Sequence, residues 1–115
     1  GFLRSFQGEA GSDSLPEANG WFRPDKRWLR IALHNEGASR LTLVVTPAAY
    51  LKAAPRRHRL EPGASVMDDW DLRASHNWYD FIVTCLEVPG FQRRFAGHGE
   101  DGRPSVSDPL LGRQA

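Results

Sequence analysis

At 115 residues, the chain is long enough to bury one hydrophobic core and too short for two domains. Hydrophobic residues make up 40% of the sequence and charged residues 25%, a composition that excludes an intrinsically disordered chain. The 15 basic and 14 acidic residues give a formal charge of +1, and this balance excludes the basic surface that a nucleic-acid partner would need.

The first half of the chain is predicted to contain a linker and two strands. Residues 9–27 are rich in Gly, Pro, Ser and charged residues, which is typical of a linker. In residues 28–35 every second residue is large and apolar, the pattern of a half-buried strand, and residues 41–46 repeat it. Turn-forming residues at 35–40 predict that these two strands pair as a hairpin.

Two shorter strands are expected in the middle of the chain. The first covers residues 57–60 and is followed by Glu61-Pro62-Gly63, which suits a type II turn because Gly accepts the positive φ required there. In the second, residues 64–72, Asp68 falls on the same side as its apolar neighbours. We therefore expect this strand to lie partly at the edge of a sheet.

The last third carries the strongest strand pattern. A turn at 74–77 leads into alternating residues at 78–88, and Pro89-Gly90 is predicted to turn the chain into a final strand. No useful window shows apolar residues at helical spacing without a proline or glycine. The fold class predicted is all-β, a small antiparallel β-sandwich with immunoglobulin-like layering, and its strand order is left open.

An eight-residue motif occurs twice. Residues 1–8 (GFLRSFQG) and 90–97 (GFQRRFAG) agree at five of eight positions. The repeat predicts that residues 1–8 are the tail strand of a preceding copy of the same domain. The paired Phe residues are expected to anchor the strand to the core.

No catalytic, cofactor-binding or metal-binding residues are predicted. The four His residues are isolated, and Asp68, Asp69 and Asp71 lack the spacing of a calcium loop, so we expect solvated carboxylates there. Nucleophile and phosphate-loop motifs are absent. Cys85, the single cysteine, is expected to be a small core residue.

Two groups of residues are candidates for surface contacts. The basic run at 56–59 (RRHR), with Lys52 just before it, is typical of a solvated loop or edge strand, but it would also suit lipid head groups. Among the four Trp residues, Trp70 and Trp78 follow core-like patterns, whereas the other two are the more exposed pair. The candidate lipid-surface contacts are Lys52, Arg56, Arg57, Arg59, Trp21 and Trp28.

The C-terminal third resembles a known family. The segments 78–80 (WYD), 91–98 (FQRRFAGH) and 102–109 (GRPSVSDP) are similar to the C-terminal domain of bacterial phosphocholine-preferring phospholipases C, of the non-hemolytic and hemolytic type. The strands near 31–50 and the turn before Trp70 are also similar, so the resemblance predicts a domain at 28–112. One departure is 85–90 (CLEVPG), where the family would have a looser polar hairpin.

The resemblance implies a non-catalytic accessory domain. It would follow a phosphatase-like catalytic domain that hydrolyses phosphatidylcholine to diacylglycerol and phosphocholine, in a secreted or periplasmic bacterial protein. Its partners would be that upstream domain, the preceding repeat and a phospholipid surface, and no cofactor is implied. A carbohydrate-binding domain and a purely structural spacer are the alternatives.

Overall fold

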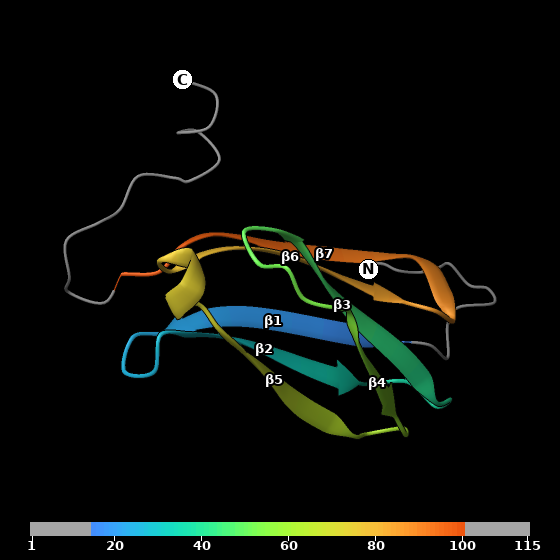
Figure 1. Ribbon diagram of the computed structural model, residues 1–115. Coiled ribbons are helices and arrows are strands. Elements are labelled where there is room, and N and C mark those ends of the chain that lie inside the picture. Colours follow the sequence, from blue (N-terminus) through green and yellow to red (C-terminus); the bar gives the residue numbers. More distant parts are fainter. Residues whose placement is uncertain (1–14, 101–115) are drawn as a thin grey trace.

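Seven β-strands form two layers in the computed structural model, which describes residues 15–100 (Figure 1). A short 3₁₀ helix at Arg73–Ser75 joins the fifth and sixth strands. Within the described residues no helix is long and apolar enough to cross a membrane. The strands are β1 (Pro16–Arg23), β2 (Trp28–Asn35), β3 (Leu41–Ala49), β4 (Arg56–Leu60), β5 (Ser65–Asp71), β6 (Trp78–Cys85) and β7 (Val88–His98).

The two layers are antiparallel sheets that pack face to face. One sheet has the order β1-β2-β5 and the other β4-β3-β6-β7, so the chain passes between sheets after β2, β4 and β5. Figure 1 shows the smaller sheet below and β3, β6 and β7 above it. This arrangement confirms the predicted β-sandwich with immunoglobulin-like layering.

The core between the sheets comes from the alternating residues of the central strands. The predicted alternation in 28–35, 41–46 and 78–85 is confirmed, and β5 is an edge strand as expected. Because neighbouring residues of a strand point to opposite faces, one residue in two enters the core. The fully buried apolar side chains of these three strands are Leu29, Ile31, Leu33, Leu41, Leu43, Val45, Phe81 and Val83.

The predicted linker at 9–27 is wrong for residues 16–23, which form β1. This strand pairs with β2 along its whole length, from Pro16 to Arg23. Its sequence is weakly apolar because it lies at a sheet edge, where Pro is tolerated as the first residue. Gly20 leaves room for the ring of Phe95 on β7, which an added Cβ would approach to 2.9 Å. Residues 1–8, 9–14 and 101–112, with the proposed repeat tail, lie outside the described residues.

The predicted hairpin between 28–35 and 41–46 is also wrong, because β2 and β3 belong to different sheets. Asn35 forms the corner between them. Its buried side-chain amide donates to the carbonyls of Ser39 and Leu60, and its Oδ1 accepts from the Gly37 N–H. The turn residues at 35–40 thus redirect the chain to the opposite layer instead of reversing it within one sheet.

The other predicted turns are present with one displacement. Gly63 has a φ of 80°, as the turn before β5 requires, and His76 and Asn77 both adopt positive φ after the 3₁₀ helix. The last hairpin, however, reverses at 86–87, so Pro89-Gly90 lies inside β7. Glu87 fixes this reversal, since its carboxylate accepts from the backbone N–H and hydroxyl of Thr42.

Candidate functional site

A buried carboxylate joins the two sheets at the edge where β4 faces β5. Asp68, on β5, is 3% exposed. It accepts hydrogen bonds from Nη1 of Arg56 at 2.6 Å and from Nε1 of Trp70 at 2.9 Å. Nε2 of His58 lies 3.2 Å from its second oxygen. The Arg56 guanidinium also stacks on the Trp70 ring at 3.7 Å, so Arg56 closes the sandwich at this edge.

The expectation of solvated carboxylates at 68, 69 and 71 is therefore wrong for Asp68. Its basic partner comes from the facing sheet, and this pairing offsets the cost of burying a charge. Asp69 is half-buried on the outer face and accepts two hydrogen bonds from Arg30. Asp71 is exposed and is paired with Arg73. All three carboxylates have cationic partners in the fold.

The pairing of Asp69 and Asp71 makes stability depend on pH. Hydrogen bonds from Arg30 hold the pKa of Asp69 below its usual value, and those from Arg73 lower the pKa of Asp71. A carboxylate with a lowered pKa in the folded state contributes stability that is complete above its unfolded pKa of about 4. That contribution is lost as the pH falls through the lower folded-state pKa.

We expect the free energy of unfolding to fall as the pH is lowered from about 5 to about 2. Urea denaturation at a series of pH values, followed by tryptophan fluorescence, measures it. The double variant Asp69→Asn/Asp71→Asn should show a shallower decline, because it lacks two of the carboxylates that bind protons on unfolding. An unchanged slope in this variant would contradict the assignment.

The four tryptophans divide between core and surface. Trp70 is 2% exposed and Trp78 is half-buried, in agreement with their predicted packing. Trp21 is 44% exposed, as expected for the surface pair. Trp28 is half-buried, and the side chains of Arg23 and Lys26 lie over its ring. Trp21 is thus the most exposed of these four residues.

The six candidate lipid contacts do not form one surface. Arg57 and Arg59 are exposed on β4, in register with Val44 and Thr42, whose side chains point outward from the larger sheet. Trp21 and Trp28 lie on the outer face of the smaller sheet, on the other side of the sandwich. Lys52 lies in the loop before β4, and Arg56 is held by Asp68. The structure separates the aromatic from the basic candidates.

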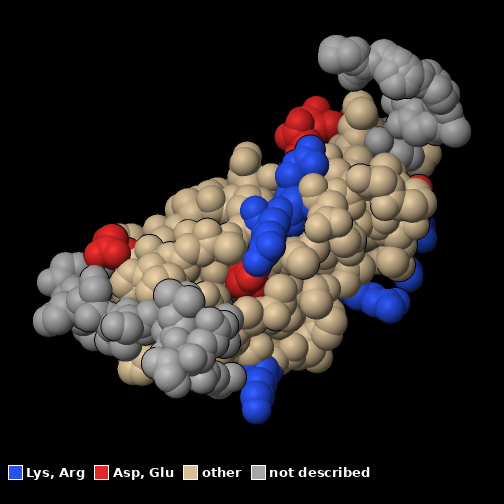
Figure 2. Space-filling model, turned by 90° about the horizontal axis from the view of Figure 1, so that it is seen from above, with Lys and Arg blue, Asp and Glu red and all other residues tan. Residues whose placement is uncertain are grey.

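The outer side of the larger sheet carries a limited amount of charge. Figure 2 looks down on this side and shows Lys and Arg side chains in a narrow band, with carboxylates beside it and uncharged surface around it. Arg94 on β7 pairs there with Asp80 on β6, whose side chain is 10% exposed. Nε and Nη2 of Arg94 donate to both oxygens of Asp80, which raises the pKa of Arg94 and leaves this cation paired within the domain.

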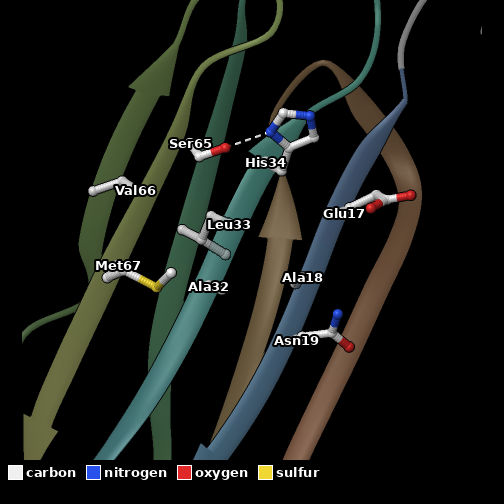
Figure 3. Close-up of a pocket in the computed structure, with 9 residues that line it drawn as sticks. All are labelled: Glu17, Ala18, Asn19, Ala32, Leu33, His34, Ser65, Val66 and Met67. Carbon is white, nitrogen blue, oxygen red and sulfur yellow. Dashed lines mark hydrogen bonds between the residues drawn. The ribbon is translucent and has the colours of Figure 1, made fainter.

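A second surface was missed by the sequence analysis because β1 was not recognised as a strand. On the outer face of β1, β2 and β5, Ala32 lies between Asn19 and Met67 in the sheet register. Its small side chain leaves a hollow of about 120 Å³, shown in Figure 3. Met67 is 53% exposed at the rim of this hollow. We call the outer face of β1, β2 and β5 the Trp21 face.

No cluster of potential metal ligands occurs within residues 15–100. Two of the His side chains are instead engaged locally: His34 is hydrogen-bonded to Ser65, and His98 to Glu100. Cys85 is buried as predicted, and burial raises the pKa of its thiol, which keeps it protonated and unreactive. The polar groups described here hold the sandwich together.

Comparison with known proteins identifies the relatives of this sandwich. The chain is 44% identical to a non-hemolytic phospholipase C of Burkholderia pseudomallei over 115 residues. It is 38% identical to a hemolytic phospholipase C of Pseudomonas aeruginosa and 37% identical to a non-hemolytic one from the same organism. These matches cover 96–97% of the chain but only 16–17% of each relative.

The family match has the same extent as the fold. Residues 16–98 match the family described as bacterial phospholipase C, C-terminal domain. These limits coincide with the first residue of β1 and the last residue of β7. The resemblance found in the sequence is confirmed, and the chain belongs to the bacterial phospholipase C C-terminal domain family.

Proposed function

We propose that this chain is a non-catalytic accessory domain that stabilises and positions the catalytic domain of a phospholipase C. The observation that carries the proposal is the family match over the entire sandwich, residues 16–98. The parent protein would be a secreted or periplasmic bacterial enzyme that cleaves phosphatidylcholine into diacylglycerol and phosphocholine. The catalytic groups would then lie in the larger part of the polypeptide that this chain does not cover.

The buried carboxylates of this domain are bound to arginine side chains, and this supports a non-catalytic role. The carboxylates that are most withdrawn from water, Asp68 and Asp80, are bound to Arg56 and Arg94. A general acid or base needs a position within hydrogen-bond reach of a substrate, whereas these groups face one another across or along the sheets. The described polar residues therefore suit a scaffold.

Deletion of residues 16–98 from the full-length phospholipase tests the proposal. We expect lower yield and faster thermal inactivation, while the activity per correctly folded molecule stays unchanged. The intact full-length protein, purified in parallel, is the reference. The proposal fails if the isolated domain itself hydrolyses phosphatidylcholine, or if deletion leaves yield and thermal stability unaltered.

A second function, contact with a phospholipid surface, is favoured by the basic side chains near β4. Lys52, Arg57 and Arg59 are exposed and make no ion pair within the described residues. Each such cation near an anionic membrane is worth about 1 kcal/mol, and salt weakens the attraction. Co-sedimentation with phosphatidylcholine vesicles, with and without anionic lipid, tests this role. Binding that is lost in high salt and in the triple Ala variant would support it, and absence of binding would remove it.

A further inference from the structure

The apolar side chains that this domain exposes are concentrated on the Trp21 face. Four large apolar side chains of the described residues are exposed: Leu15, Trp21, Met67 and Leu86. Trp21 and Met67 point outward from the smaller sheet. The carbonyl of Leu15 accepts from the Glu36 N–H, which extends the ladder of β1 and β2, and by alternation its side chain points to the same side. Single exposed apolar residues are ordinary, but Met67 borders the hollow over Ala32, and an exposed apolar side chain beside a hollow marks a candidate interaction surface.

The outer positions of the Trp21 face carry no excess of cations, since Glu17, Asp69 and Asp71 outnumber Arg23 and Arg30. Arg30, at its centre, donates to both oxygens of Asp69, and Nη2 of Arg23 lies 3.2 Å from the carboxylate of Asp25. Steering toward an anionic membrane needs uncompensated cations. This face has none among its described residues, and Glu17, which is exposed at the edge of the hollow, would repel an anionic lipid surface, so a protein surface is the better partner.

The hollow over Ala32 is large enough to receive a side chain of a partner. Its volume of about 120 Å³ compares with the cavity of about 150 Å³ that accepts benzene in an engineered protein core. It can therefore receive one aliphatic or aromatic side chain. Figure 3 shows Met67 and Asn19 on opposite sides of Ala32, where they would hold such a group.

We propose that the Trp21 face is the surface by which this domain docks onto the catalytic domain of the same polypeptide, with one apolar side chain of that domain seated over Ala32. The proposal rests on the proposed function and identifies the surface that serves it. The chain covers 16% of the Burkholderia relative, so most of such a polypeptide lies outside the sandwich and is tethered to it. Tethering raises the effective concentration of that partner far above that of a separate protein.

Oxidation of Met67 in the full-length phospholipase tests the proposal directly. Met67 is the single methionine of this chain and is 53% exposed on the face in question. Docking would cover its sulfur, and hydrogen peroxide would react only in the undocked state. If the undocked state is populated at 10% or less, Met67 is oxidised about ten-fold or more slowly than in a protein whose domain is always undocked.

Two substitutions give the matched comparison. Ala32→Arg fills the hollow and should raise the rate of Met67 oxidation by about ten-fold. Thr46→Arg places the same side chain on a central strand of the opposite outer face and should leave the rate at that of the wild type. Cys85, 3% exposed, reports folding in the same samples, since it is alkylated only if the sandwich opens. If the Ala32→Arg variant exposes Cys85, it is replaced in the experiment by Asn19→Arg, which changes an exposed residue next to Ala32 on β1.

The outcomes separate this proposal from the proposed function. Equal oxidation rates in the wild type and in a folded Ala32→Arg variant would overturn the docking face. Protection that depends on protein concentration would overturn it in favour of a second copy, and protection seen only with phosphatidylcholine vesicles would overturn it in favour of a membrane. If deletion of 16–98 lowers the stability of the enzyme, but Met67 of the intact enzyme is not protected from oxidation, the accessory role stands and this docking face is rejected.

Discussion

Replacing Asp68 by Asn should lower the free energy of unfolding by about 3 kcal/mol. The carboxylate is 3% exposed and receives hydrogen bonds from Arg56 and from the indole of Trp70. An amide of the same size turns a donating NH₂ group toward one of these donors and removes the negative charge that compensates Arg56. The loss should stay at the lower end of the range for buried pairs, because the Arg56 side chain is 45% exposed and can be rehydrated.

Urea denaturation of the variant measures this effect, and Asp69→Asn is the matched control. The two aspartates are neighbours on β5, each is paired with an arginine, and only the first is buried. The control should cost much less, because its ion pair lies on the outer face. A double-mutant cycle with Arg56→Gln would isolate the coupling between the sheets. Similar losses for Asp68→Asn and Asp69→Asn would refute the role given to burial.

Truncation of Phe81 to Ala should cost about 4 kcal/mol. The side chain is 0% exposed on the central strand β6, and its ring lies 4.7 Å from that of Trp70. Removing the ring leaves a cavity between two sheets whose backbones are held by ladder hydrogen bonds and cannot collapse to fill it. Because a small domain is stable by about 5–15 kcal/mol, the variant should unfold at markedly lower urea concentration or temperature.

The adjacent residue provides the control for this prediction. Ile82 lies on the outer side of the same strand and is half-buried, so Ile82→Ala should cost about 1 kcal/mol. Thermal unfolding followed by near-ultraviolet circular dichroism would compare the two. Equal losses would mean that the ring of Phe81 is not a central part of the core.

The sequence alone predicted the strands that carry strong alternation and missed what depends on distant partners. β2, β3 and β6 were predictable because their burial follows residue parity. β1 was not predicted because Pro16 and Gly20 weaken the strand pattern of its sequence. It is a strand because it pairs with β2 along its whole length. The assignment of β2 and β3 to one hairpin failed because turn chemistry is local, whereas the choice of sheet depends on the side-chain bonds of Asn35 with Ser39 and Leu60.

The exposure of individual side chains was also predictable only where it did not depend on a distant partner. The exposure of Trp21 was predicted from its position, but the burial of Asp68 required knowledge that Arg56 faces it from another strand. Arg56 had been grouped with its neighbours in a basic run. In the fold, alternation along β4 turns Arg57 outward and leaves Arg56 to reach β5. Charge runs therefore separate into structural and free cations only once the strand pairing is known.

The passage of the chain between sheets after β2, β4 and β5 has a consequence for folding kinetics. Neither sheet is formed from one uninterrupted stretch of sequence, because strands of the other sheet lie between its own strands along the chain. Topologies of this kind fold in milliseconds to seconds, more slowly than locally connected ones. Before β5 arrives, the smaller sheet is only the β1–β2 hairpin, and a lone hairpin is at best marginally stable in water. The domain should therefore fold and unfold in one slow cooperative step, with no stage at which one sheet is complete and the other absent.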